Sequence, residues 1–183
     1  MTIAIMLDIE TLSFKPESVI LTLGAVKFNP FVVDDIRDGL YLRLDVDEQV
    51  ALGREIDEST VEWWGKQLPE IRDEALTDEG RISLAEFHSQ LNKFLVGVDE
   101  IWCQGPVFDI GILEHFYRQN GWPRAWHYWQ VRDSRTLFGV HGDPRDRNSA
   151  GLHNAFEDCL SQAKAVQKVY QRLNLTKESK WQK

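Results

Sequence analysis

The sequence predicts an α/β fold, with a mixed five-stranded sheet flanked by helices. Residues 3–44 contain three apolar segments joined by short polar stretches, which is the pattern of an antiparallel meander. Further along, segments of helical periodicity alternate with two short apolar runs, which indicates parallel strands joined by helical crossovers. Polar residues at the carboxyl ends of such strands are the first candidates for a functional site.

Length and composition favour a single domain with a substantial core. The chain has 183 residues, of which 43% are hydrophobic. We expect one domain over residues 1–175 and a polar basic tail at 176–183. No apolar run approaches the length of about 18 residues that a membrane span needs, and no basic segment precedes the first apolar run, so neither a membrane span nor a signal peptide is expected. Cys103 and Cys159 lie far apart in apolar contexts, which favours a reduced, cytoplasmic protein.

The charge of the chain limits the class of partner. A formal net charge of −8 argues against a large basic surface that tracks phosphates. It leaves room for a nucleic-acid enzyme, because a site built from carboxylates can bind divalent cations that reverse the local charge.

Three strands are expected in the meander. The first begins with the apolar residues 3–7, the second covers residues 19–28 and ends at an Asn-Pro pair, and the third covers residues 41–44. Residues 47–76 are polar with helical periodicity, so helices should separate the meander from the next strand.

The next segments predict a helix, a strand and a second helix. Ser83 and Glu86 form a capping box in front of an apolar helical face. A short strand follows at residues 100–103, and residues 108–120 read as a helix with Gly121 at its C-terminal cap.

The last part of the chain predicts one more strand and one more helix. Residues 128–131 have the composition of a fifth strand. The polar residues 142–149 are expected to be mobile, and residues 153–173 repeat apolar side chains at helical spacing.

Two carboxylates stand where the first strand should emerge from the core. Asp8 and Glu10 project from the same face of a strand, about 7 Å apart along the chain. Oxygen ligands of this kind suit Mg²⁺ or Mn²⁺. Because Asp45 and Asp47 have the same spacing elsewhere in the chain, a solvated strand end is the alternative interpretation of this pair taken alone.

Three further polar residues follow predicted elements. Asp109 falls in the first turn of a helix, where an acid is also favoured by the helix dipole alone. His153 and Asp158 would lie roughly 140° apart if both were helical, so we expect His153 to precede the last helix and Asp158 to lie on it. Taken singly, an exposed or capping histidine and a solvated helical acid are the simpler explanations.

Together, these residues resemble the three motifs of the DEDDh 3′–5′ exonucleases. The motifs are Asp8-Ile9-Glu10-Thr11, then Phe108-Asp109, then His153 with Asp158 five positions later, and the resemblance spans residues 3–172. That family has a ribonuclease-H-like fold. Asp133 also resembles the Asp that follows the fifth strand in many members. The segments at 60–64, 133–136 and 153–159 are most similar to the phage DexA-like branch and its related exoribonuclease subgroup.

The resemblance implies a role for each motif residue. Asp8 would bridge two divalent ions, Mg²⁺ or Mn²⁺, while Glu10 and Asp158 would hold the ion that carries the attacking water and Asp109 would serve the other. His153 would be the general base, since an imidazole titrates near neutrality.

Substrate contacts are expected from a second set of residues. The terminal nucleotide would meet Thr11 and Leu12, and a base would stack on Phe108 or Trp64, although core packing explains one of the two neighbouring tryptophans equally well. Phosphates would meet Arg135. His141 is a rival general base that lacks a carboxylate at the family's spacing.

The leading hypothesis is a metal-dependent exonuclease that releases nucleoside 5′-monophosphates from the 3′ end of single-stranded DNA or RNA. Two alternatives are a catalytically silent nucleic-acid-binding module with the same fold and a related endonuclease. The presence of all five motif side chains speaks against the first, and the position of His153 speaks against the second. Exposed tryptophans would also allow a homodimer.

Overall fold

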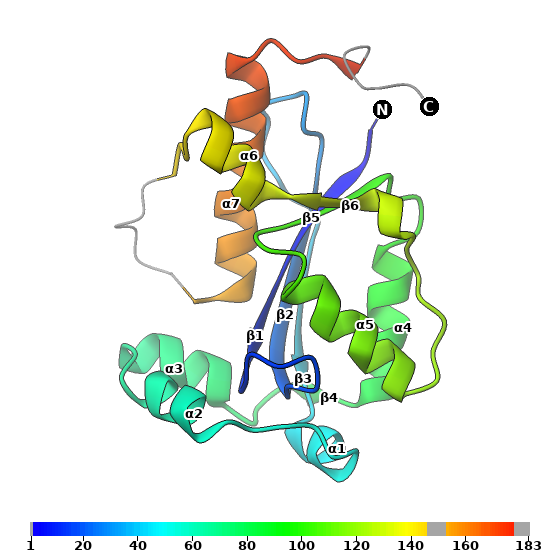
Figure 1. Cartoon of the computed structure of the whole chain (residues 1–183), viewed down its shortest axis with the longest axis vertical. Coiled ribbons are helices and arrows are strands. Elements are labelled where there is room, and N and C mark those ends of the chain that lie inside the picture. Colours follow the sequence, from blue (N-terminus) through cyan, green and yellow to red (C-terminus); the bar gives the residue numbers. More distant parts are fainter. Residues whose placement is uncertain (1, 146–152, 178–183) are drawn as a thin grey trace.

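The computed structural model describes residues 2–145 and 153–177 and contains a six-stranded mixed sheet (Figure 1). The strands lie in the order β4-β3-β2-β1-β5-β6. Their bounds are β1 Ala4–Thr11, β2 Ile20–Phe28, β3 Gly39–Leu44, β4 Arg81–Ile82, β5 Glu100–Cys103 and β6 Val131–Asp133. β1 pairs antiparallel with β2 and β2 with β3, whereas the β1–β5, β5–β6 and β3–β4 pairs are parallel. The predicted meander that continues into parallel strands is therefore confirmed.

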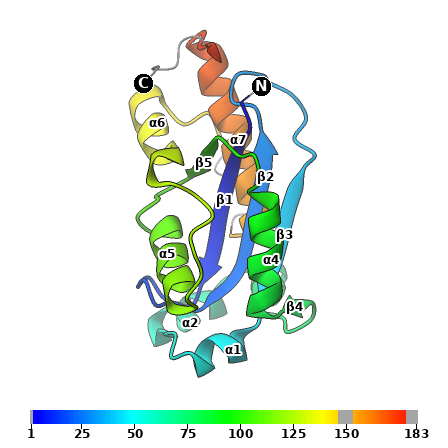
Figure 2. The same cartoon turned by 90° about the vertical axis from the view of Figure 1, so that its right-hand side faces the viewer.

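Helices cover both faces of the sheet and one of its ends. Their bounds are α1 Val46–Ala51, α2 Glu58–Gly65, α3 Pro69–Leu76, α4 Leu84–Phe94, α5 Asp109–Gln119, η1 Tyr128–Gln130 (a 3₁₀ helix), α6 Ser134–His141 and α7 Ala155–Arg172. Helices α4 and α5 lie on one face, α7 lies on the other, and α1–α3 gather beyond the carboxyl end of β1 (Figures 1 and 2). The expected helical cap forms at Ser83, whose hydroxyl accepts the backbone N–H of Glu86.

The two faces of β1 bury two different cores. Successive side chains on a strand point to opposite faces. Ile5, Leu7 and Ile9 pack in the core under α4 and α5, whereas Ala4 and Met6 pack in the core under α7. By the same alternation, Asp8 and Glu10, the two acids of the first motif, project toward α7.

Arg54 is a buried arginine that links the turn after β1 to helix α5. The side chain of Arg54 is 4% exposed and donates hydrogen bonds to the Ser18 carbonyl at 2.7 Å and to the side chain of Gln119 at 3.0 Å. Burial lowers the pKa of this guanidinium to about 10, which leaves it charged at neutral pH. The loop that leaves the end of β1 is therefore anchored to α5.

The structure corrects two predictions about the sheet. The sheet has six strands because β4, which has only two residues, adds to the free edge of β3. The fifth predicted strand, at residues 128–131, is wrong in position: Tyr128–Gln130 form the 3₁₀ helix η1, and the strand begins at Val131, where pairing with Ile101 starts. The side chain of Gln130 accepts the backbone N–H of His127 and stabilises the helical turn.

Two predicted segments fall partly outside the described residues. Residues 146–149 of the segment expected to be mobile and residues 178–183 of the expected tail are among them. Over the ranges that are described, no helix combines the length and the apolar character required to span a bilayer.

Candidate active site

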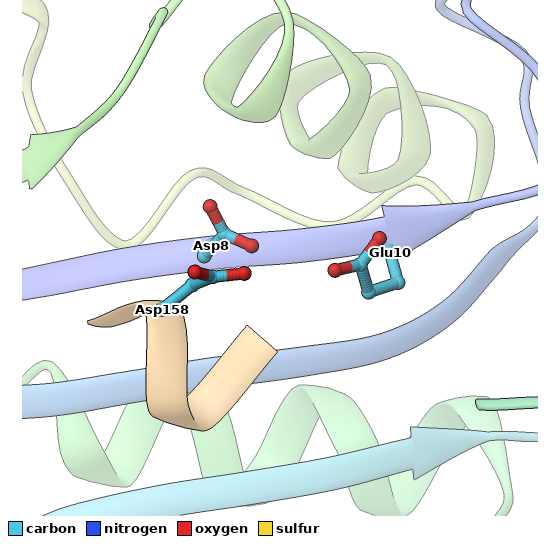
Figure 3. Close-up of side chains that lie close together, drawn as sticks. All are labelled: Asp8, Glu10 and Asp158. Carbon is cyan, nitrogen blue, oxygen red and sulfur yellow. The ribbon is translucent and has the colours of Figure 1, made fainter. Parts of the chain in front are cut away.

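Three carboxylates meet where β1 faces the first turn of α7. Figure 3 shows the side chain of Asp158 reaching from α7 to that of Asp8, with Glu10 further along β1. One oxygen from each of the three lies within 4.8 Å of the others. Ligand oxygens around one Mg²⁺ lie up to about 4.2 Å apart. Adjacent ligand oxygens lie about 3 Å apart, so the three side chains would have to move closer together to share an ion.

The close approach of α7 to the sheet depends on a glycine in β2. Gly24 lies opposite Asp8 in the β1–β2 register. A Cβ atom on Gly24 would lie 2.3 Å from the carbonyl oxygen of Ala155 and 2.5 Å from the backbone nitrogen of Phe156, at the start of α7. The thiol of Cys159 donates to the Gly24 carbonyl at 3.3 Å. The missing side chain thus lets the helix start rest on the strand beside Asp8.

We expect the Gly24→Ala variant to lose both stability and activity. The new methyl group must push the first turn of α7, and Asp158 with it, away from the other acids, and a shift of about 1 Å at a reacting centre costs on the order of 100-fold in rate. Nucleotide release and thermal unfolding measure the two effects. The control is Gly139→Ala in α6, where no atom lies within 4 Å of the added carbon. Activity at the wild-type level in Gly24→Ala would contradict this role.

Asp109 lies beside the three acids as the first residue of α5. Its side chain is 4% exposed, and the backbone N–H groups of Ile9 and of Asp109 itself hydrogen-bond to it. Ile9 stands between the two acids of β1, so this hydrogen bond holds Asp109 beside the same point of the strand. Its charge raises the pKa of both Asp8 and Glu10. It lies outside the group of three whose oxygens share the 4.8 Å limit.

Burial and mutual repulsion favour the protonated form of these acids. Burial, followed by the charges of Asp109, Glu10 and Asp158, raises the pKa of Asp8 well above its ordinary range. The same two effects raise the pKa of Glu10 to about 8, and burial raises that of Asp109 to about 7. Burial also raises the pKa of Asp158, although the hydrogen bond from the backbone N–H of His153 lowers it in part. Buried carboxylates that repel one another bind cations readily, because a cation offsets both the burial of their charge and their repulsion.

We expect the metal-free protein to lose stability as the pH rises from about 4 to about 8. Unfolded carboxyls ionise near pH 4, whereas in the folded protein the pKa of Asp109 is about 7 and that of Glu10 about 8. The folded state therefore holds more protons than the unfolded state in this interval, so the unfolding free energy falls as the pH rises through it. Because divalent ions bind the ionised form, Mn²⁺ should raise the melting temperature more at about pH 8 than at about pH 5.

Thermal unfolding in EDTA and in Mn²⁺ at the two pH values checks this expectation. The Glu10→Gln variant is the control, since it removes one of the shifted groups and should show a smaller loss of stability with rising pH. The same melting-temperature gain from Mn²⁺ at both pH values would contradict the account.

His153 precedes α7, as the sequence predicted. Its backbone has a φ of 70°, in the left-handed region that few residues other than glycine adopt. Its N–H donates to Asp158 Oδ2 at 2.9 Å, and the next residue, Asn154, caps the helix by accepting the N–H groups of Phe156 and Glu157. The imidazole stands edge-on to the ring of Trp63, with 4.8 Å between centroids. One backbone hydrogen bond thus links the candidate base to a candidate metal ligand.

The two neighbouring tryptophans of α2 have different environments. Trp64 is 1% exposed, packs in the core beside Leu12, and donates its indole N–H to the Thr11 carbonyl at 3.0 Å. Trp63 is 39% exposed and contacts His153. The structure therefore gives Trp64, which the sequence offered for base stacking, a packing position, and presents Trp63 at the site.

The other predicted substrate contacts lie around the same strand end. Thr11 and Leu12 are both 6% exposed, and the Thr11 hydroxyl already donates to the Ser13 carbonyl at 2.8 Å. Phe108 is half-buried, 6.2 Å from the exposed ring of Phe14. Arg135 is exposed, and its guanidinium donates to the Gln104 carbonyl at 2.8 Å.

Two residues compared with the family in the sequence have local roles in the structure. Asp133 caps α6 by accepting the backbone N–H groups of Arg135 and Thr136. His141 is the last residue of the same helix, and its carbonyl accepts a hydrogen bond from Arg172.

Three residues at the site were missed by the sequence interpretation. Gln162 donates to Asp8 Oδ1 at 3.3 Å, and its position one helical turn after Asp158 was the available signal. Gly24 is an isolated glycine within a strand, which often marks a close approach of another backbone. Trp63 and its neighbour Trp64 are equally apolar, so the sequence does not indicate which of the two is exposed.

The fold and the gathered acids define a class of protein. A mixed sheet flanked by helices, with its carboxylates at the end of the first strand, is the ribonuclease-H-like arrangement of DEDDh-type 3′–5′ exonuclease domains. Residues 3–170 match the 3′–5′ exoribonuclease Rv2179c-like domain. The chain belongs to this family.

Known relatives and solved structures agree with this class. The exodeoxyribonuclease of Enterobacteria phage T4 is 27% identical over 188 residues, a match that covers 84% of this chain and 82% of the phage protein. The zinc-bound E. coli exonuclease I–single-stranded DNA complex has a similar fold, with a TM-score of 0.66, 16% identity and 94% of this chain covered. Exonuclease I with a dA16 oligonucleotide gives a TM-score of 0.60, also at 16% identity and 94% coverage of this chain. The chain spans only 41% and 42% of the length of the exonuclease I chains.

Proposed function

We propose that the protein removes nucleotides one at a time from the 3′ end of single-stranded nucleic acid and releases nucleoside 5′-monophosphates. The observation that carries this proposal is the convergence of Asp8, Glu10 and Asp158 within 4.8 Å, with Asp109 buried beside them. Four acids whose pKa values burial raises form a set of oxygen ligands that suits Mg²⁺ or Mn²⁺.

The acids divide into the roles that a hydrolysis of phosphodiesters requires. Asp8, which feels the charges of all three other acids, would hold both of two divalent ions. Glu10 and Asp158 would hold one of them, and Asp109, buried beside them, would serve the other. When bound, such a pair of ions lowers the pKa of the attacking water and stabilises the departing oxygen.

His153 would accept the proton of the attacking water. Its backbone N–H is fixed on Asp158 and its ring rests against Trp63, so the imidazole stands next to the acids without being one of the gathered ligands. A general base at this position contributes on the order of 10² to 10⁴ in rate.

The exposed face of Trp63 would stack on a base of the substrate, in place of the buried Trp64. Phe108 and Phe14 would provide apolar contacts on the other side of the strand end. Stacking of a base on an aromatic ring is worth about 1–3 kcal/mol and does not depend on the sequence of the strand. Such contacts fit an enzyme that shortens strands of any sequence.

The sugar of the substrate is where the known relatives differ, since the matched family is described as an exoribonuclease and the phage relative as an exodeoxyribonuclease. The test is therefore digestion of 5′-labelled DNA and RNA single strands of the same sequence, each with Mg²⁺, Mn²⁺ or EDTA. We expect a ladder that shortens stepwise from the 3′ end and vanishes in EDTA. The faster strand identifies the sugar.

A circular single strand is the matched control for this digestion. It has no 3′ end, so an exonuclease leaves it intact whereas an endonuclease cuts it. Cutting of the circle, or binding of the linear strand without cleavage under any metal, would contradict the proposal and favour one of the two alternatives.

Residues 1–175 would act as one exonuclease domain, followed by a basic tail. The described cysteines, Cys103 and Cys159, are both buried free thiols, which suits activity in the reducing cytoplasm.

A further inference from the structure

Gln162 lies on the face of α7 that carries Asp158. The two residues are four positions apart, one helical turn, so their side chains are neighbours on that face. The side chain of Gln162 is 4% exposed, and its Nε2 donates to Asp8 Oδ1 at 3.3 Å. The helix therefore reaches Asp8 twice, once with a carboxylate and once with an amide.

The other end of the same amide is buried without a donor. Among residues 2–145 and 153–177, Gln162 Oε1 meets no hydrogen-bond partner. Native proteins rarely leave a buried amide oxygen in this condition. Mg²⁺ keeps several of its waters when it binds to proteins, and each of these waters can donate a hydrogen bond to such an oxygen.

We propose that Gln162 is a positioning residue of the metal site, whose N–H fixes the Asp8 carboxylate and whose Oε1 accepts from the hydration of the divalent ions. The inference rests on the proposed metal-dependent function. Asp8 is otherwise surrounded by three acids that repel it, and a neutral amide can hold its carboxylate in place without a positive charge that would compete with the ions. Groups that orient a metal ligand in this way typically change metal affinity or activity by about 10- to 100-fold.

The chain contains a matched control on the same helix. Gln167 is 1% exposed, and its Nε2 donates to the Asn29 carbonyl at 3.1 Å and to Asp34 Oδ1 at 3.2 Å. Its Oε1 also lacks a donor among the described residues. The two glutamines thus share burial, helix and amide chemistry, and only Gln162 contacts a site residue.

The experiment compares Mn²⁺ binding by calorimetry to the wild-type protein, Gln162→Met and Gln167→Met. Methionine keeps the length of the side chain and removes both polar atoms. We expect Gln162→Met to bind Mn²⁺ about 10- to 100-fold more weakly and Gln167→Met to bind it as the wild type does. Gln162→Asn, which keeps the amide but is one methylene shorter, should also weaken binding, and it serves as the test if the methionine variant does not fold.

Wild-type affinity in the Gln162 variants would overturn the inference. So would equal weakening in Gln162→Met and Gln167→Met, because the effect would then come from packing of the helix. A wild-type protein that binds no Mn²⁺ would overturn both the metal site and the role of Gln162. A wild-type protein that binds Mn²⁺ but does not shorten an oligonucleotide would overturn the proposed reaction alone, and the binding comparison would still decide the role of Gln162.

Discussion

Replacing Asp8 with asparagine is expected to lower the rate of nucleotide release by about 1,000-fold or more. Asp8 is the acid whose pKa is raised by the charges of all three others, so it is the one on which shared ions should depend. Metal ions contribute several kcal/mol to this kind of catalysis, and each 1.36 kcal/mol is tenfold in rate. The variant keeps the shape of the side chain and removes one of four mutually repelling acids, so it should fold and should gain stability in EDTA.

The matched control is Asp47→Asn. Asp47 belongs to a second pair of acids with the same spacing, but it lies exposed at the start of α1. Its replacement should leave both nucleotide release and metal binding unchanged. If Asp8→Asn retained wild-type activity, the proposed site would be wrong.

Replacing His153 with alanine is expected to lower the rate by about 10²- to 10⁴-fold while Mn²⁺ binding stays close to that of the wild type. The reason is that His153 contacts Asp158 through its backbone N–H, which alanine retains, whereas the imidazole is the part that would move the proton. Rate measurements at saturating metal, together with calorimetry, separate the two effects.

His141→Ala is the control for this variant, because His141 lies at the end of α6 and is the rival base in the sequence. It should retain activity. Loss of Mn²⁺ binding in His153→Ala would show that the histidine is needed for the metal site, and loss of activity in His141→Ala alone would transfer the role of base to that residue.

Most of the sheet, and the placing of Asp8 and Glu10 on one face, could be predicted from simple periodicities, whereas their gathering with Asp109 and Asp158 was implied by the resemblance to the DEDDh exonucleases. Side chains alternate along a strand, so Asp8 and Glu10 lie on one face of β1. In the sheet, this is the face that α7 covers. The 3.6-residue period of a helix indicated that His153 precedes the helix that carries Asp158. The structure agrees on both points.

The parts that could not be predicted depend on tertiary contacts. The residues Tyr128–Gln130 have the composition of a strand, yet a local cap between His127 and Gln130 makes them a 3₁₀ helix. Adjacent helical positions differ by about 100°, so a pair of tryptophans does not reveal which one faces the core. That Trp64 is the buried one depends on the Thr11 carbonyl, which accepts its indole N–H.

The central claim is that these acids hold two divalent ions, and diffraction from a Mn²⁺-soaked crystal tests it most directly. We expect two anomalous peaks about 3.5–4 Å apart, with Asp8 next to both, Glu10 and Asp158 next to one and Asp109 next to the other. Absence of Mn²⁺ from the end of β1 in a protein that still degrades nucleic acid would contradict it.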